Sequence, residues 1–465
     1  MDAMPPFDAD LLRRYDRPGP RYTSYPTAPQ FGASFGPLEF ARAARASNDD
    51  PIPRRLSVYA HVPYCFSPCF YCGCNRIITR DKGRAEPYLQ RLVRETALVG
   101  PQFDRDREVI QVHLGGGTPN FLTPTQIGEF LESLATHFRL STSPTRDFSI
   151  ELDPRFVNPG DIEALAFMGF NRASLGVQDF DREVQVAVNR IQSVEETRQV
   201  VDDCRKLGFR SVNVDLIYGL PKQNLDGFSK TLDTVIQARP DRLAVYSYAH
   251  LPAMFKPQRQ IDEADLPAPE TKLALLQMAI EKLTAAGYVY IGMDHFALPD
   301  DDLATAQARG GLHRNFMGYT THADTDLVGL GVSAISHIGD TFSQNPRDLP
   351  SWQIALDEGR LPVFRGMALS EDDQLRADLI QSLMCQGVIP IDALERRYAI
   401  DFAEYFSDAL DRLFPLVEDG LVRVEERRIV ATSRGRLLLR NIAMCFDRYL
   451  DPAPVPMASR FSRAI

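Results

Sequence analysis

Four cysteines within ten residues carry the most chemical information in this chain: Cys65, Cys69, Cys72 and Cys74. Thiolates are the preferred ligands of iron–sulfur clusters and common ligands of zinc. The first three are spaced by four and three positions, which lets them surround one corner of a metal centre. A [4Fe–4S] cluster held by three cysteines keeps one iron open for a small substrate. Four crowded thiols also match the ligand count of a structural zinc site, which is the alternative.

The spacing favours the cluster, because zinc sites usually draw their ligands from two separated pairs. Cys72 and Cys74 are only two positions apart, about 6.5–7 Å at Cα in an extended chain. A fourth thiolate would also close the open iron, so Cys74 is expected not to be a ligand. The remaining cysteines, Cys204, Cys385 and Cys445, lie in helical patterns and are expected to be buried apolar residues.

Composition sets the class of protein. The 465 residues are 44% hydrophobic, which excludes a disordered or collagen-like chain, and the formal net charge is -10. An acidic chain does not bind nucleic acid through its bulk charge. No apolar run approaches the ~20 residues that span a bilayer, and residues 1–8 lack the order of a signal peptide. We expect a cytoplasmic protein with no membrane span, no nucleic-acid partner and no disulfide framework.

Short apolar runs alternate with amphipathic helical patterns over about 190 residues. The expected strands are 57–61, 109–114, 148–152, 173–177, 211–217 and 242–246, and the helices include 86–99, 126–138, 194–207 and 227–238. This alternation predicts a parallel sheet with right-handed crossovers. Periodicity alone leaves a doubly wound sheet and an incomplete barrel both open.

Three domains are expected. Residues 1–50 form an arm, because the prolines of residues 18–26 prevent a continuous helix; residues 51–350 form the β/α domain, and residues 351–465 a mainly helical domain. The elements expected after the sixth strand are helices 270–286, 369–384, 391–398, 402–414 and 433–450, an edge strand at 288–293, and a hairpin of 421–424 with 428–431. Helices followed by a small hairpin suggest a winged-helix-like domain.

Polar residues follow several of the expected strands. Gly115-Gly116-Gly117-Thr118 comes directly after the run 109–114, and backbone N–H groups of such a turn can approach a polar ligand closely. Glu151 and Asp215 end two other strands, where carboxylates can accept hydrogen bonds from ribose hydroxyls. Taken alone, such a turn is more often an ordinary loop, and such carboxylates are more often paired strand-end charges.

The motif C-x3-C-x2-C directly after the first strand is the signature of the radical S-adenosylmethionine (SAM) superfamily. The fuller pattern resembles the oxygen-independent coproporphyrinogen III oxidase family over essentially the whole chain. The matching segments are 19–27, 59–65, 72–75, 115–119, 176–180, 215–221, 248–252, 292–296, 331–336 and 440–447.

This resemblance implies an α/β fold: an incomplete parallel (β/α)6 radical SAM barrel, with the arm 1–50 covering the active site. It also implies a [4Fe–4S] cluster on Cys65, Cys69 and Cys72, and two SAM molecules. The cluster-bound SAM would use Tyr59, Tyr71, Gly116, Glu151 and Ile335, and the second SAM Gly117, Thr118, Gln178, Arg190, Asp215 and Ala249.

The implied reaction is the oxidative decarboxylation of two propionates of coproporphyrinogen III to vinyl groups, giving protoporphyrinogen IX for haem biosynthesis. A deoxyadenosyl radical would abstract hydrogen, an electron donor such as flavodoxin would reduce the cluster, and no protein acid or base is needed. We expect a monomer, because no long exposed heptad pattern is present.

The substrate is a flexible tetrapyrrole with four anionic propionates, so positive side chains must be concentrated locally. Arg21, Tyr22 and Phe316 are the substrate candidates, within a wider set of Lys256, Arg259, Arg314, Tyr25 and Phe255. Met317 stands where the family is expected to have Gln, which puts a polar substrate contact from that position in doubt.

Three other functions are weighed against this one. A haem-binding chaperone of the same superfamily would lack the arm and have Phe in place of Cys74, so both features favour the enzyme. A zinc-stabilised module would be colourless. A related methyltransferase shares the fold, but the arm argues against it.

Overall fold

The computed structural model describes residues 8–450, so most of the N-terminal segment used above to argue against a signal peptide lies outside the described residues. The chain forms two compact units, each built from separate stretches of sequence. The larger comprises Phe31–Ala286 and Asp324–Ala368; the smaller comprises Met1–Gln30, Gly287–Ala323 and Leu369–Ile465. The predicted boundaries after residues 50 and 350 remain a prediction.

The larger unit is built on one sheet with the strand order β9-β8-β7-β6-β4-β1-β14-β15-β16-β17. Pairing is parallel from β9 to β14 and antiparallel from there on. The strands are β1 Arg55–Val62, β4 Glu108–Gly116, β6 Asp147–Leu152, β7 Arg172–Gln178, β8 Ser211–Tyr218, β9 Arg242–Ser247, β14 Thr325–Leu330, β15 Ile335–Ile338, β16 Thr341–Gln344 and β17 Arg365–Ala368, with the short β2 Tyr64–Cys65, β3 Ile77–Ile78 and β5 Arg139–Leu140 beside them.

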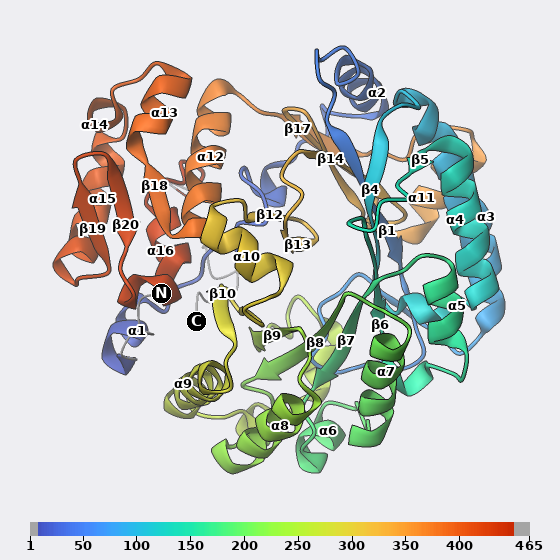
Figure 1. Cartoon of the computed structure of the whole chain (residues 1–465), viewed down its shortest axis with the longest axis horizontal. Helices are drawn as coiled ribbons and strands as arrows, with labels where there is room; N and C mark the ends of the chain where they lie inside the picture. The colour runs from blue at the N-terminus through green and yellow to red at the C-terminus, as the bar shows by residue number, and fades with distance from the viewer. Residues whose placement is uncertain (1–7, 451–465) are drawn as a thin grey trace. The chain divides into compact units, whose positions relative to one another are not determined.

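Helices connect these strands along the outer side of the sheet (Figure 1). They are α2 Pro37–Ala46, α3 Ala85–Val99, α4 Pro124–His137, α5 Asp161–Phe167, α6 Arg182–Ala187, α7 Val194–Lys206, α8 Leu225–Ala238, α9 Pro269–Ala285 and α11 Leu349–Asp357. Their starts follow local chemistry: Thr123 caps α4 together with Gln126, and Ser193 caps α7 together with Glu196. Six parallel β/α units confirm the predicted incomplete barrel.

Burial follows the strand pattern. Along β1, Leu56, Val58, Ala60 and Val62 are all fully buried on one face, and most intervening residues are buried too. A parallel sheet covered on both faces gives this near-continuous apolar run. Polar residues appear at the carboxyl ends of the strands.

The smaller unit combines helices with three small sheets or hairpins. Its elements are α1 Ala9–Tyr15, β10 Val289–Gly292, β11 His295–Ala297, α10 Asp302–Arg309, β12 His313–Asn315, β13 Gly318–Thr320, α12 Glu371–Gln386, β18 Val388–Pro390, α13 Ile391–Tyr398, α14 Phe402–Tyr405, α15 Ser407–Glu418, β19 Val422–Glu425, β20 Arg428–Ala431 and α16 Leu439–Met444. The order β18-β20-β19 makes a three-stranded wing. Helices with such a wing agree with the winged-helix-like prediction, and the edge strand predicted at 288–293 is confirmed as β10.

The helix predicted over 433–450 is wrong. A 3-10 turn, Arg434–Leu438, precedes the short α16, which ends at Met444. Gly435 lies against the backbone of Leu421, the residue before β19. A Cβ on Gly435 would be only 2.0 Å from the Leu421 carbonyl oxygen, so this contact shapes the turn. Beyond α16, the Asp447 carboxylate accepts the Tyr449 N–H at 2.8 Å, a local bond that competes with helix continuation.

Three further differences concern elements that have no strong pattern of their own. The helix predicted over 402–414 is divided into α14 and α15 at Phe406, whose side chain is almost fully buried. The arm contains a complete helix, α2, and Gly32 pairs with Gly366 beside β17. The antiparallel strands β15 to β17 were not predicted.

Candidate active site

A cavity of about 290 Å³ lies at the carboxyl ends of the parallel strands in the larger unit. Eleven of the predicted cluster and SAM residues line it: Cys65, Cys69, Tyr71, Cys72, Gly116, Gly117, Thr118, Glu151, Gln178, Arg190 and Asp215. These residues come from β2 and the loop after it, from the carboxyl ends of β4, β6 and β7, from β8, and, for Arg190, from the loop between α6 and α7. The fold therefore brings together side chains that are up to 150 positions apart in the sequence.

Arg76 fixes the loop that carries the cysteines. Its guanidinium donates to the backbone carbonyls of Cys69 at 3.1 Å, Cys72 at 2.8 Å and Cys74 at 3.4 Å. Gly73 lets the ring of Phe255 lie against the same loop, because a Cβ there would be 2.9 Å from that ring. The loop is thus held by contacts within the larger unit.

Each of the three predicted cluster ligands accepts a hydrogen bond from a neighbour. Thr118 Oγ1 donates to Cys65 Sγ at 3.3 Å, Arg190 Nη1 to Cys69 Sγ at 3.6 Å, and the Cys74 N–H to Cys72 Sγ at 3.4 Å. A hydrogen bond from the Cys74 side chain lowers the pKa of Cys72 to about 6, toward the thiolate that binds iron, whereas burial raises the pKa of Cys65 to about 11 although Thr118 donates to it. Within residues 8–450, no three His, Cys, Asp or Glu side chains gather closely enough to hold a single metal ion. The three thiols instead share the wall of a cavity.

The glycine turn at the end of β4 has no room for side chains. Gly116 has φ +112, and a Cβ there would meet the His61 ring at 2.4 Å; a Cβ on Gly117 would meet the Pro63 backbone at 2.7 Å. The Gly117 N–H also donates to the Val62 carbonyl at 2.8 Å. The turn therefore runs directly beside the strand that leads to the cysteines.

Glu151 places a carboxylate on the cavity wall. It accepts the Gly116 N–H at 3.0 Å and lies 3.4 Å from the His113 ring, which in turn contacts Ser149 at 2.7 Å. Burial acts to raise the pKa of Glu151, but His113 and the Gly116 N–H outweigh it and leave the pKa below its usual value. An ionised carboxylate here is an acceptor for hydroxyl groups of a ligand.

Asp215 has the opposite shift. Burial raises its pKa to about 6, although Asn213 donates to it at 2.8 Å and Ser174 at 3.2 Å; the charge of Glu151 adds to the rise. Of the carboxylates that line the cavity, Glu151 thus has a lowered pKa and Asp215 a raised one.

Arg190 is one of three arginines that line the cavity, with Arg76 and Arg155. Its guanidinium pairs with Asp153 at 3.1 Å, and both side chains are 7% exposed. Arg155 donates to the same carboxylate at 2.6 Å. Yet Arg190 Nε and the Gln178 side-chain oxygen are buried without any hydrogen-bond partner. A donor and an acceptor left unmet in one cavity fit a ligand with polar groups of both kinds, such as the amino acid end of SAM.

Three predicted SAM residues do not line this cavity: Tyr59, Ile335 and Ala249. The Tyr59 hydroxyl contacts the His61 ring at 3.0 Å, and the Ala249 carbonyl accepts from Gln258 at 3.1 Å. Ile335 begins β15 and follows the turn after β14. Their predicted roles remain predictions.

Sequence reasoning missed Asp153, Arg155 and Arg76. Asp153-Pro154-Arg155 directly follows β6, so the strand-end argument applied to Glu151 would also have found these two. Arg76 follows the cysteines by two positions, but nothing in the pattern indicates that its side chain folds back onto their carbonyls.

The substrate candidates belong to the smaller unit. Arg21 lies 3.5 Å from Asp294, and the buried Tyr22 donates to Asp447 at 3.0 Å. Phe316 follows β12, in the turn that leads to β13. Their roles toward substrate are untested.

Two families match parts of the chain: the radical SAM superfamily over residues 59–235, and the HemN C-terminal domain over residues 369–438. A relative from Pseudomonas aeruginosa, named oxygen-independent coproporphyrinogen III oxidase, is 52% identical over 459 residues, 99% of both chains. The relative of the same name from Escherichia coli is 47% identical and covers 99% of this chain and 98% of its own. The chain belongs to the oxygen-independent coproporphyrinogen III oxidase family.

A solved structure supports the same family. The radical SAM enzyme coproporphyrinogen III oxidase (HemN) from Escherichia coli matches with a TM-score of 0.90 and 46% identity, over 96% of this chain and 99% of its own. For a member of the oxygen-independent coproporphyrinogen III oxidase family, the radical SAM domain implies a [4Fe–4S] cluster and SAM. The cavity fits both, since it combines three hydrogen-bonded thiols with unmet polar atoms and a side-chain-free turn.

Proposed function

We propose that the chain converts coproporphyrinogen III to protoporphyrinogen IX without oxygen, as a radical SAM oxidoreductase of haem biosynthesis. Each of two propionates loses a hydrogen atom from the carbon next to the ring to the deoxyadenosyl radical, then loses CO2 and passes one electron to a terminal electron acceptor, and so becomes a vinyl group. The observation that carries the proposal is the single cavity in which three cysteines, the glycine turn and the unpaired atoms of Arg190 and Gln178 meet.

Cys65, Cys69 and Cys72 are the proposed ligands of the cluster. Bound at the cluster, SAM supplies the radical that abstracts hydrogen. Glu151 and the backbone of Gly116 and Tyr71 would hold that SAM, through the carboxylate and N–H groups that line the cavity. Tyr59 and Ile335 are assigned to the same molecule by the family pattern alone.

A second SAM is part of the proposal. Arg190, Gln178, Thr118, Gly117 and Asp215 line the same cavity, and Ala249 joins them by the family pattern. Arg190 would offer its unpaired Nε to a carboxylate, while Asp153 keeps the guanidinium oriented. The raised pKa of Asp215 does not oppose a role as acceptor at neutral pH, where it is mostly ionised.

Arg21, Tyr22 and Phe316 are proposed substrate residues, and flavodoxin or a similar one-electron donor is the proposed reductant. We further propose a cytoplasmic monomer. Among the described residues, no helix is long and apolar enough to cross a bilayer.

An anaerobic assay tests this function. Reconstituted protein, dithionite, SAM and coproporphyrinogen III should give 5′-deoxyadenosine and the divinyl product, with two deoxyadenosines for each protoporphyrinogen IX. The matched control is Cys69→Ala, which should give neither. The haem-chaperone alternative predicts tight haem binding with no decarboxylation, and that result would replace the proposal.

A further inference from the structure

Arg314 is a buried cation without a counter-ion. It lies in β12 of the smaller unit, and only 6% of the residue is exposed. Among residues 8–450, its Nε and Nη1 are buried without a hydrogen-bond partner, and no ion pair of Arg314 with a carboxylate is formed. An unpaired buried charge is costly, so a protein that keeps one normally supplies or receives an anion there.

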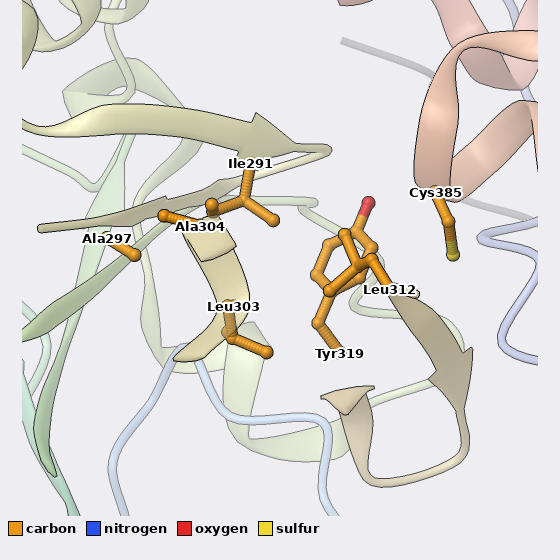
Figure 2. Packing of buried hydrophobic residues seen from close by; sticks show 7 residues of the cluster. All are labelled: Ile291, Ala297, Leu303, Ala304, Leu312, Tyr319 and Cys385. Carbon is orange, nitrogen blue, oxygen red and sulfur yellow. The ribbon is translucent and has the colours of Figure 1, made fainter. Parts of the chain in front are cut away.

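The Arg314 guanidinium packs on one aromatic ring. Its guanidinium carbon lies 4.7 Å from the centre of the Tyr319 ring, a cation–π distance. Tyr319 is held in turn by its hydroxyl, which donates to the Met384 carbonyl at 3.2 Å. Its ring belongs to a buried apolar cluster with Ile291, Ala297, Leu303, Ala304, Leu312 and Cys385 (Figure 2). The Tyr319 ring covers one face of the Arg314 guanidinium, so the N–H groups in the guanidinium plane can still donate to an acceptor.

Other arginines share this neighbourhood. Burial, together with the charges of Arg21 and Arg314, lowers the pKa of Arg440 to about 10, while Asp294 acts in the opposite sense. Arg440 itself donates to the Pro20 carbonyl at 2.9 Å, next to Arg21 in the chain. Arg21 and Arg314 therefore add positive charge to one region of the smaller unit.

We propose that Arg314 binds a propionate carboxylate of the tetrapyrrole substrate, in a subsite where Arg21 adds positive charge. The inference rests on the proposed function, because that function supplies a substrate with four carboxylates. A carboxylate fits the planar fork of a guanidinium, and the Nε and Nη1 of Arg314 have no other acceptor within the part of the chain that the structure describes. SAM also carries a carboxylate, so the test must separate the two sources.

The test uses the reconstituted full-length protein. Arg314→Met removes the donors but keeps much of the volume over Tyr319, and Arg314→Lys keeps a charge without the fork. Arg396→Met, on the exposed surface of α13 in the same unit, is the control. Anaerobic binding is followed by fluorescence with coproporphyrin III, the stable oxidised tetracarboxylate, and with its tetramethyl ester; turnover is followed as vinyl product.

We expect Arg314→Met to weaken coproporphyrin III binding and raise KM for coproporphyrinogen III at least tenfold, as for loss of a charged hydrogen bond. Arg314→Lys should recover part of the loss, and Arg396→Met should match the wild type. The wild type should prefer the acid over the ester, and Arg314→Met should lose much of that preference. SAM cleavage without substrate should be unchanged in all variants.

Three results would overturn the subsite. The first is unchanged affinity in a folded Arg314→Met protein, and the second is a wild type that binds the ester as tightly as the acid, which requires no variant. The third is loss of SAM cleavage without loss of porphyrin binding, which would assign Arg314 to SAM. Failure of the proposed function is a separate outcome, since it appears as wild-type protein that binds porphyrin but makes no vinyl product.

Discussion

The Glu95 carboxylate accepts the indole N–H of Trp352 at 3.0 Å in the interior of the larger unit. The same carboxylate accepts the Gly331 N–H at 2.7 Å and the Asn345 amide at 2.6 Å. Glu95 is 1% exposed and has no cationic partner among the described residues. These bonds tie α3 and α11 to the turn between β14 and β15, which leads to Ile335.

The Glu95 site predicts a pH-dependent stability. Burial raises the pKa of Glu95, and the hydrogen bonds from its three donors lower it. Burial has the larger effect, so the pKa rises from 4.5 to about 7. Between these values the folded chain keeps a proton that the unfolded chain has released. The unfolding free energy should therefore fall as pH rises from about 4.5 to 7, by at most about 3 kcal/mol.

Urea unfolding from pH 5 to pH 8 measures this slope. Glu95→Gln should be less stable than the wild type at pH 5, because the new side-chain amide group would face the Asn345 amide group. The unfolding free energy of this variant should not show the fall with pH that is assigned to Glu95. Glu358→Gln, on the exposed surface, is the control and should keep it. Equal slopes in wild type and Glu95→Gln would show that Glu95 does not titrate in this range.

Gly117→Ala should abolish SAM cleavage. The added Cβ would lie 2.7 Å from the backbone of Pro63, which joins β1 to β2 two residues before Cys65 and cannot move without moving the cluster loop. The measurement is 5′-deoxyadenosine formed per chain. Gly128→Ala in α4 is the control: a Cβ there has only an ordinary contact with Met168, and the change should stabilise the helix by up to ~1 kcal/mol. A fully active Gly117→Ala protein would contradict the close approach.

Cys65→Ala, Cys69→Ala and Cys72→Ala should each lose the brown chromophore or SAM cleavage, because each removes one of three thiolates from an already open cluster. Iron content, visible absorption and 5′-deoxyadenosine are the measurements. Cys204→Ala, at a buried thiol in α7, is the matched control and should keep its iron. Full activity in any of the first three variants would remove that cysteine from the ligand set.

Cys74→Ser should keep the [4Fe–4S] spectrum and SAM cleavage, while formation of vinyl product falls. Its backbone N–H contacts Cys72 Sγ at 3.4 Å and its side chain also hydrogen-bonds to Cys72, and serine retains both the N–H and a side-chain donor. Iron per chain and vinyl product are measured side by side. Loss of iron in Cys74→Ser would make Cys74 a ligand.

The sequence was most informative where a local pattern is also a structural rule. The apolar runs at 211–217 and 242–246 predict β8 and β9 to within one residue at each end, because buried parallel strands need continuous apolar segments. The expectation that polar residues at strand ends contact a ligand likewise identified Glu151 and Asp215. Arg76 escaped it, since its contacts depend on how a loop folds back, and the helix predicted at 433–450 failed because Leu421, distant in sequence, constrains Gly435.

The smaller unit joins the two ends of the chain: Asn441 donates to the Tyr15 carbonyl at 2.7 Å, and Arg440 to the Pro20 carbonyl across 420 positions. A ribosome adding ~5–20 residues per second needs about 20 to 80 s to make that length of chain. Residues 8–30 therefore emerge long before the side chains that hold them exist. The residues of the larger unit are synthesised before the C-terminal partners of the N-terminal segment. The N-terminal segment therefore stays exposed to proteases and chaperones until synthesis is almost finished.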